Sequence, residues 1–140
     1  SYVNPLRQDL ALSSFARQIV AIEHGRQSYI KHGNLDSVRA FCDVRDFVKA
    51  YVLAQTPGIY NIGGSETASI GECLEMLIKM SPARIECHTD PDLERPTDIV
   101  SQIPDCSRFY SATGWKPLIT LKDSLHWLLE HYREADKRAA

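Results

Sequence analysis

The sequence predicts an α/β domain whose sheet is incomplete. Helical and strand-like segments alternate along the 140 residues, and no repeat, low-complexity stretch or linker interrupts them. The chain has no strand–turn–helix opening with the glycine spacing G-x-G-x-x-G, and its strands are too few for a complete doubly wound sheet. We therefore expect one domain, residues 1–140, in which helices flank an incomplete sheet.

Apolar residues at helical spacing predict a first helix over residues 14–24, which Gly25 ends. Short extended segments are expected at 28–31 and 38–42. The buried face of the first helix would be formed by Phe15, Ile19 and Ile22.

Asp43 is a suitable cap for a second helix, and Asp46 lies in its first turn. Pro57-Gly58 ends this helix. Residues 58–62 (GIYNI) have almost no polar face and therefore predict a buried strand, followed by a turn at Gly63-Gly64. The second helix would bury Val44, Phe47, Val48 and Tyr51.

Ser69 and Glu72 form the S-x-x-E pattern of a capping box, which predicts a third helix that Pro82 ends. A strand is expected at 84–88. Residues 91–104 contain three prolines and predict a long surface loop with some extended structure.

Two more helices are expected near the C-terminus. The first is short, with Asp105 as its cap and Gly114 at its end. Thr120 caps the last helix, and the charged tail after Arg133 is expected to fray.

Composition restricts the partners and the compartment. The formal net charge of −2 argues against a general nucleic-acid-binding protein, although a few arginines suffice for a small anion. No apolar run is long enough for a membrane helix. Four cysteines without C-x-x-C spacing predict buried or half-buried thiols in a reducing compartment, so a cytoplasmic location is expected.

Arginines beside turn residues are the most informative candidates for a binding site. Arg39 follows a loop, and Arg95 lies in D-L-E-R-P-T-D. A guanidinium grips phosphate oxygens in pairs, so two of them from separate loops would clamp a diphosphate. A surface arginine is more often only a solvated charge. The same two alternatives, ligand contact or solvation, apply to Arg17.

The remaining motifs favour structural roles. Gly63-Gly64-Ser65 resembles a phosphate-binding turn, but a tight turn explains both glycines without a ligand. His126 and His131 are five residues apart and fall on different helix faces, so no metal site is expected. Trp115 after Gly114 is expected to anchor a core.

Taken together, six segments resemble the C-terminal half of extended short-chain dehydrogenases that act on GDP-mannose and its 4-keto-6-deoxy product. These enzymes are of the GDP-mannose 4,6-dehydratase and GDP-6-deoxy-4-keto-mannose reductase type, within the NAD-dependent epimerase/dehydratase superfamily. The resemblance covers nearly the whole chain. The segments are residues 15–25 (FARQIVAIEHG), 33–51 (GNLDSVRAFCDVRDFVKAY), 60–64 (YNIGG), 69–74 (SIGECL), 95–98 (RPTD) and 112–117 (ATGWKP).

The resemblance implies the fold and the site. The fold would be the substrate-binding half of an extended Rossmann-type dehydratase, without the N-terminal dinucleotide-binding domain. Arg39 and Arg95 match the family's diphosphate-binding arginines, and Asp98 matches an acidic residue near the ribose. Asn34 lies in the loop near the nucleotide, Asn4 approaches the sugar nucleotide, and Arg17 matches a basic position on the flanking helix.

Two local departures from the family pattern affect this comparison. The family's R-D-F reads R-A-F here, so Ala40 stands where an acidic residue would support Arg39. The opening segment is also compressed, which leaves the match of Asn4 open by a residue or two.

The family's catalytic pattern Y-x-x-x-K is absent from this sequence. Without a lysine beside a tyrosine, no general acid–base is present for oxidation at C4 of the sugar, and without the glycine turn there is no site for the family's NADP. The residues four positions after the six tyrosines are Leu6, Gly33, Gln55, Gly64, Gly114 and Asp136.

We therefore expect a GDP-sugar-binding fragment of a dehydratase-like enzyme, with no catalytic residues and no cofactor of its own. The alternative is a stand-alone interaction module that reuses the fold and associates with another copy. A separately supplied N-terminal half is a further possible partner.

Overall fold

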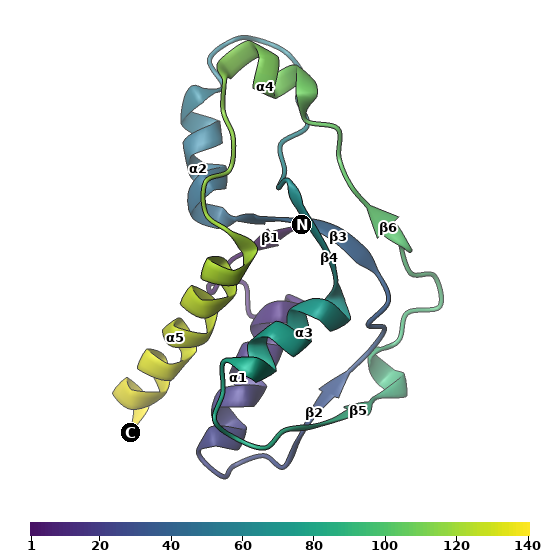
Figure 1. The fold of residues 1–140 in the computed structure, drawn as a ribbon, viewed down its shortest axis with the longest axis vertical. Coiled ribbons are helices and arrows are strands. Elements are labelled where there is room, and N and C mark those ends of the chain that lie inside the picture. Colours follow the sequence, from purple (N-terminus) through teal and green to yellow (C-terminus); the bar gives the residue numbers. More distant parts are fainter.

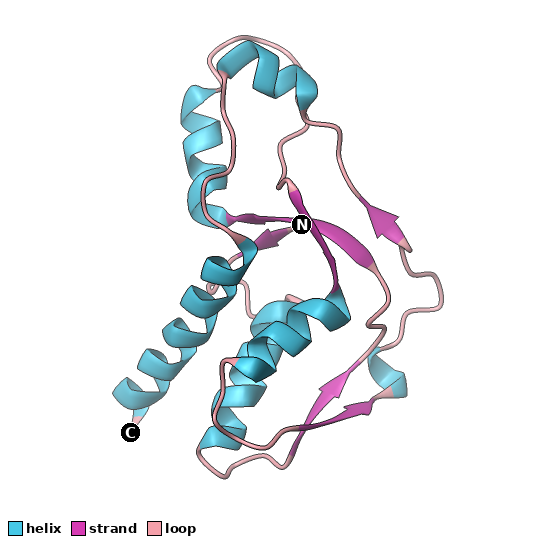
Figure 2. Ribbon diagram, viewed as in Figure 1, coloured by secondary structure: helices cyan, strands magenta, loops and turns pink.

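The computed structural model describes residues 1–140, and it is an α/β structure with two separate groups of strands (Figures 1 and 2). The larger sheet is centred on β3 (Val38–Asp43). One edge of β3 pairs with the antiparallel strand β4 (Glu66–Ser69), and the other edge pairs with two short parallel strands. These are β1 (Tyr2–Val3) and β6 (Ser101–Gln102).

The two short strands share one edge of β3. In β6, Ser101 pairs with Val38 at the start of β3, whereas Tyr2 of β1 pairs with Cys42 near its end. The smaller sheet consists of two parallel strands, β2 (Tyr29–His32) and β5 (Glu86–Thr89). The predicted incomplete sheet with flanking helices is confirmed.

Three helices form the main core on one side of the larger sheet. They are α1 (Ala11–Glu23), α3 (Ile70–Lys79) and α5 (Leu121–Ala139). Their apolar faces bury a cluster of 17 residues, to which the sheet contributes Val3, Phe41 and Ala68. This cluster stabilises the fold by removing apolar surface from water.

A smaller cluster lies at the other end of the molecule, where α2 (Val44–Leu53) and α4 (Ser107–Thr113) lie together at the top of Figure 1. It contains Cys42, Ala50, Phe109 and Trp115. The expected core role of Trp115 is confirmed, since its side chain is buried edge-on against the ring of Phe109.

The local helix signals are confirmed. The Asp43 side chain accepts the Arg45 N–H at the start of α2, and Ser69 and Glu72 form both bonds of the capping box of α3. Thr120 caps α5. Gly114 ends α4 with a φ of 70°, a conformation that glycine adopts without strain.

The strand predicted at 58–62 is wrong. This segment has no strand partner, Ile59 is 87% exposed, and the chain joins the sheet only at β4. A Cβ at Gly64 would overlap the backbone carbonyl of Phe41. Glycine at this position therefore lets the turn pass close to β3. An apolar run supplies side chains for a strand but not the neighbouring strand that its backbone needs.

Other boundaries also differ. The first helix starts at Ala11, β5 is shifted to Glu86–Thr89, and the predicted fraying after Arg133 is wrong because α5 continues to Ala139. The loop at 91–104 contains a 3-10 helix, η1 (Pro91–Leu93), and β6. All four cysteines are free, and Cys87 is exposed although a buried or half-buried thiol was expected. None of the helices combines the length and the apolar composition needed to cross a membrane.

Candidate functional site

A hollow of about 600 Å³ lies beside the central strand β3, which is within the usual size range of a ligand site. Tyr2 of β1, Arg39 and Phe41 of β3 and Gln102 of β6 all contribute to its wall. Arg39 and Phe41 are two positions apart, so both side chains fall on the same face of the strand. The hollow therefore forms where the two short strands meet the edge of β3.

Basic side chains outnumber acidic ones in the wall of the hollow, four to two. This excess favours an anionic ligand, since net positive charge in a concave site attracts anions. The charged residues of the wall are Arg7, Asp9, Lys31, Arg39, Arg95 and Asp98.

Arg39 has the geometry of a ligand-binding arginine. Its side chain is only 15% exposed, and one guanidinium nitrogen, Nη1, is buried without any hydrogen-bond partner. A second nitrogen, Nη2, lies 3.8 Å from Asp98 Oδ1, which is ion-pair distance but too far for a hydrogen bond. Buried donors are nearly always paired in folded proteins, so Nη1 is suited to an acceptor on a bound molecule.

Asp98 is held in the wall of the hollow by neighbours on both sides. Its Oδ2 accepts the Asn34 side-chain N–H at 2.8 Å, and its Oδ1 accepts the backbone N–H of Ile99 at 2.9 Å. Asn34 is fixed in turn, because its Oδ1 accepts the Asp36 backbone N–H at 2.9 Å. These bonds orient both polar side chains before any ligand binds.

The loop that carries Arg95 and Asp98 is attached to the segment before β3. Asp90 N donates to His32 O at 2.8 Å, and Val38 N donates to Val100 O at 2.9 Å. A Cβ at Gly33 would overlap the backbone carbonyl of Leu93, so glycine permits this close approach. The two segments are about 60 residues apart in sequence, and these bonds place Arg95 in the same hollow as Arg39.

The six predicted site residues thus divide into two groups. Asn34, Arg39, Arg95 and Asp98 line the one hollow. Asn4 and Arg17 do not contribute to its wall. The Asn4 side chain accepts the Leu6 N–H at 3.0 Å, and the exposed Arg17 donates to Gln8 at 3.2 Å.

Sequence reasoning missed part of the wall of the hollow. Tyr2, Arg7 and Asp9 precede α1, Lys31 and His32 end β2, and Gln102 belongs to β6. Arg7 and Asp9 are two residues apart with opposite charges, which is a visible local signal. The other residues have no local pattern, because only the pairing of the strands brings them to the hollow.

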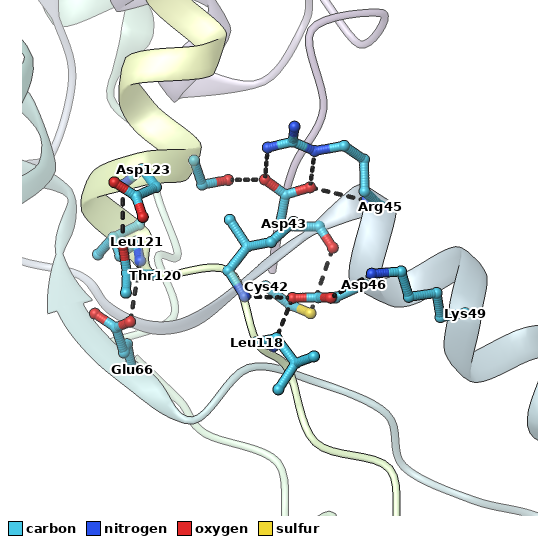
Figure 3. Close-up of polar contacts among 12 residues, drawn as sticks. Cys42, Asp43, Arg45, Asp46, Lys49, Glu66, Leu118, Thr120, Leu121 and Asp123 are labelled. Atoms are coloured by element: carbon cyan, nitrogen blue, oxygen red, sulfur yellow. Dashed lines mark hydrogen bonds and ion pairs between the residues drawn. The ribbon is translucent and has the colours of Figure 1, made fainter.

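A second polar network, at the junction of β3 and α2, has a structural role (Figure 3). Both Asp43 and Asp46 are 1% exposed. Asp43 accepts two bonds from the Arg45 side chain and one from Ser124 of α5. Burial raises the pKa of Asp43, but the bonds from Arg45 and Ser124 outweigh it and hold the pKa below its ordinary value. With these partners, the carboxylate joins β3 to two helices and is not open to a ligand.

The residues present do not fit a dinucleotide cofactor. Such a cofactor needs a glycine-rich turn between a strand and a helix, where free N–H groups face the pyrophosphate. Here the turn from β3 into α2 is capped by Asp43 and the turn from β4 into α3 by Ser69, whose side chains occupy N–H groups at the helix starts. No group of three or more His, Cys, Asp or Glu side chains is arranged to hold a metal ion.

The sequence profile of a family described as GDP-mannose 4,6 dehydratase matches residues 3–128. Among curated proteins, the GDP-6-deoxy-D-mannose reductase of Pseudomonas aeruginosa is 30% identical over 138 residues, which cover 94% of this chain and 45% of that protein. The dTDP-D-glucose 4,6-dehydratase of Homo sapiens is 29% identical over 125 residues, covering 83% of this chain and 35% of that protein.

Solved structures show the same similarity. RMD from Pseudomonas aeruginosa, complexed with NADPH, superposes with a TM-score of 0.86 at 28% identity, over 96% of this chain and 46% of that one. A putative epimerase from Burkholderia cenocepacia gives a TM-score of 0.78 at 25% identity, over 91% and 42% of the two chains. This chain therefore spans less than half the length of these relatives.

Proposed function

Because this chain belongs to the GDP-mannose 4,6 dehydratase family, we propose that its hollow binds the nucleoside diphosphate part of a GDP-sugar, and that the chain alone does not convert the sugar. The observation that carries the proposal is the convergence of Arg39 and Arg95 on one hollow, together with the buried, unpaired Nη1 of Arg39. Two guanidinium groups from separate loops offer paired N–H donors and neutralise the charge of a diphosphate.

The other predicted residues take supporting roles in this proposal. Asp98 accepts hydrogen bonds from ribose hydroxyls through its remaining lone pairs, while Asn34 holds that carboxylate in place. Asn4 acts indirectly, by fixing the turn that leads from β1 to Arg7. For Arg17 we propose no direct contact, because its side chain lies outside the wall of the hollow.

We propose no turnover because the chain lacks the residues that oxidation at C4 of the sugar requires. None of the six tyrosines has a lysine four positions later, so no tyrosine–lysine pair can act as the general acid–base. The starts of α2 and α3 do not fit the pyrophosphate of NADP, because the side chains of Asp43 and Ser69 occupy N–H groups there. In this proposal, catalysis and cofactor binding depend on residues that these 140 positions do not supply.

Titration calorimetry with GDP-mannose and GDP tests the proposal. We expect the wild-type chain to bind both, and Arg39→Gln to weaken both at least about tenfold, since it removes a charged donor from a largely buried position. Arg84→Gln changes an exposed arginine that does not line the hollow and should leave binding unchanged. If the wild-type chain gives no binding heat with either ligand, the proposal is wrong.

A second candidate function is an interaction module that associates with another copy of the chain or with a separate N-terminal half. The exposed apolar side chains of α2 favour this alternative. Val48 is 55% and Tyr51 67% exposed, so the burial predicted for these two residues is wrong, and Val52 is 68% exposed. Contiguous apolar surface of this kind is typical of a protein–protein contact.

The solution mass discriminates between the two functions. Light scattering after size exclusion should give a dimer or larger species if the α2 face joins two copies, and Tyr51→Glu should then return the monomer. A monomer for the wild-type chain at high concentration would exclude self-association. Co-purification from the source would reveal a separate N-terminal half.

A further inference from the structure

The outer edge of β6 has no partner strand. β6 pairs only with β3, and it lies at the margin of the molecule with no helix or strand on its outer side (Figure 1). Every residue from 99 to 103 is exposed. The larger sheet is therefore open to a further strand along this edge.

The register of β6 decides which of its backbone groups face outward. Val38 N donates to Val100 O at 2.9 Å, so the backbone groups of Val100 face β3. Successive residues of a strand direct their N–H and C=O groups to opposite edges, so those of Ser101 and Ile103 face away from β3. Outward N–H and C=O groups of this kind are a template for pairing with another extended chain.

Apolar side chains lie on both faces of this edge. Val100 is 81% and Ile103 58% exposed, and they lie on opposite faces of the strand because they are three positions apart. Natural proteins usually protect an open edge with charged residues or a covering element. No charged residue stands between positions 99 and 103, so this edge lacks that protection against pairing.

The charge around the edge selects the kind of partner. Residues 90–105 contain five acidic residues and a single basic one, Arg95. Arg95 and Asp98 line the hollow, whereas Asp92 and Glu94 before the edge and Asp105 after it are exposed. A second copy of the chain carries the same acids, so pairing two β6 edges would bring like charges together. A strand flanked by lysines or arginines is attracted instead.

We infer that the outer edge of β6 binds an extended protein segment of apolar and basic residues, which adds a strand to the larger sheet. Main-chain hydrogen bonds to Ser101 and Ile103 hold the segment, and its side chains contact Val100 and Ile103. The flanking acids give the preference for basic residues. None of these three edge residues lines the hollow, so the inference goes beyond the proposed function and does not depend on it.

Fluorescence anisotropy with two labelled peptides tests the inference. The basic peptide has the sequence KKVTVTVKK, and its acidic counterpart is EEVTVTVEE. We expect the wild-type chain to bind the basic peptide saturably and the acidic peptide at least about tenfold more weakly. The difference should shrink as salt is added, because salt screens the attraction between exposed charges.

Ser101→Pro tests the contribution of the outward backbone groups. Proline removes the outward N–H of residue 101, while the bonds to β3 are made by the neighbouring residues, and an edge strand tolerates proline at such a position. We expect this variant to weaken binding of the basic peptide at least about tenfold. Ser101→Ala keeps the backbone donor and should stay within about twofold of the wild type. Thermal unfolding checks that each variant is folded.

Glu94→Lys tests the charge preference independently, because its exposed side chain makes no hydrogen bond or ion pair and the change leaves the edge itself intact. This variant should reduce the preference for the basic over the acidic peptide at least about threefold.

Four results would overturn the inference. They are no binding of the basic peptide, equal binding of both peptides, unchanged binding by folded Ser101→Pro, and an unchanged preference in Glu94→Lys. A wild-type dimer in light scattering that Ser101→Pro dissociates would also overturn it, because the edge would then pair with a second copy.

Discussion

The Asp46 side chain shows how one buried carboxylate connects distant parts of the chain. Its Oδ2 accepts the backbone N–H groups of Leu118 and Ile119 at 2.8 Å each, although these residues are more than 70 positions away (Figure 3 labels Leu118). The sequence predicted Asp46 only as an acidic residue in the first turn of a helix. Its main role depends on the path of residues 114–120, for which no local pattern exists.

We expect Asp46→Ala to lower the free energy of unfolding by about 2 kcal/mol, because two partly buried backbone donors lose their acceptor. Asp46→Asn retains an acceptor oxygen and should cost less. Urea unfolding of the three proteins measures both differences. Equal stability of the wild type and the alanine variant would show that these bonds contribute nothing.

At the scale of elements, the contact between α1 and α5 explains why the last helix does not fray. Arg133 of α5 donates to Glu23 of α1, and Arg26 pairs with Asp136 near the end of α5. Glu23 is 13% and Arg133 21% exposed, so this pair is better shielded from water than an ordinary surface pair. Charge alone predicted a frayed tail, because the partners Glu23 and Arg26 lie 110 residues earlier in the sequence.

The Glu23–Arg133 pair should make stability depend on pH. The hydrogen bond from Arg133 outweighs burial and lowers the pKa of Glu23 below its ordinary value of 4.5. A carboxylate with a lowered folded-state pKa stabilises the protein above the unfolded-state pKa and loses this effect as the pH falls through the folded-state value. We therefore expect Glu23→Gln to be less stable than wild type at pH 7 by about 1 kcal/mol, a difference that shrinks below about pH 4.5.

Denaturant unfolding between pH 3 and pH 7 measures this difference. Glu134→Gln is the matched control, because Glu134 lies on α5 next to Arg133 and pairs with Lys137 while its side chain is 54% exposed. The free energy of unfolding of that variant should stay close to that of the wild type at every pH. A difference between wild type and Glu23→Gln that does not change with pH would contradict the assignment.

At the scale of the whole molecule, the two hydrophobic clusters differ in size and in position. The 17-residue cluster joins α1, α3 and α5 to the sheet, whereas only four buried residues hold α2 and α4 together at the other end. Local opening is easiest where few apolar contacts must be broken. The hollow lies beside the larger cluster, and Phe41 belongs to both. The candidate site is therefore supported by the more stable part of the structure.

Native-state hydrogen exchange should resolve these two parts. We expect amide protons of α4 to exchange through local opening at a lower free energy than those of α1 and α5, which should exchange only on global unfolding. Phe109→Ala should accelerate exchange in α4 while leaving α1 nearly unchanged. Equal protection of α1 and α4 would mean that the two clusters unfold as one unit.

The sequence alone determined the features that depend on neighbouring residues: the caps at Asp43, Ser69 and Thr120, the end of α4 at Gly114, and the family resemblance. Caps form within three or four positions, so their chemistry is visible in the order of residues.

Which polar side chains share a hollow depends on the tertiary structure. It left residues 58–62 without a strand partner, and it placed Arg95 and Asp98 beside Arg39 through backbone bonds between residues 32–38 and 90–100. It also brought Tyr2 and Arg7 into the same wall through the pairing of β1 with β3. Backbone pairing between distant segments uses N–H and C=O groups that every residue but proline carries, so the sequence does not mark which segments will meet.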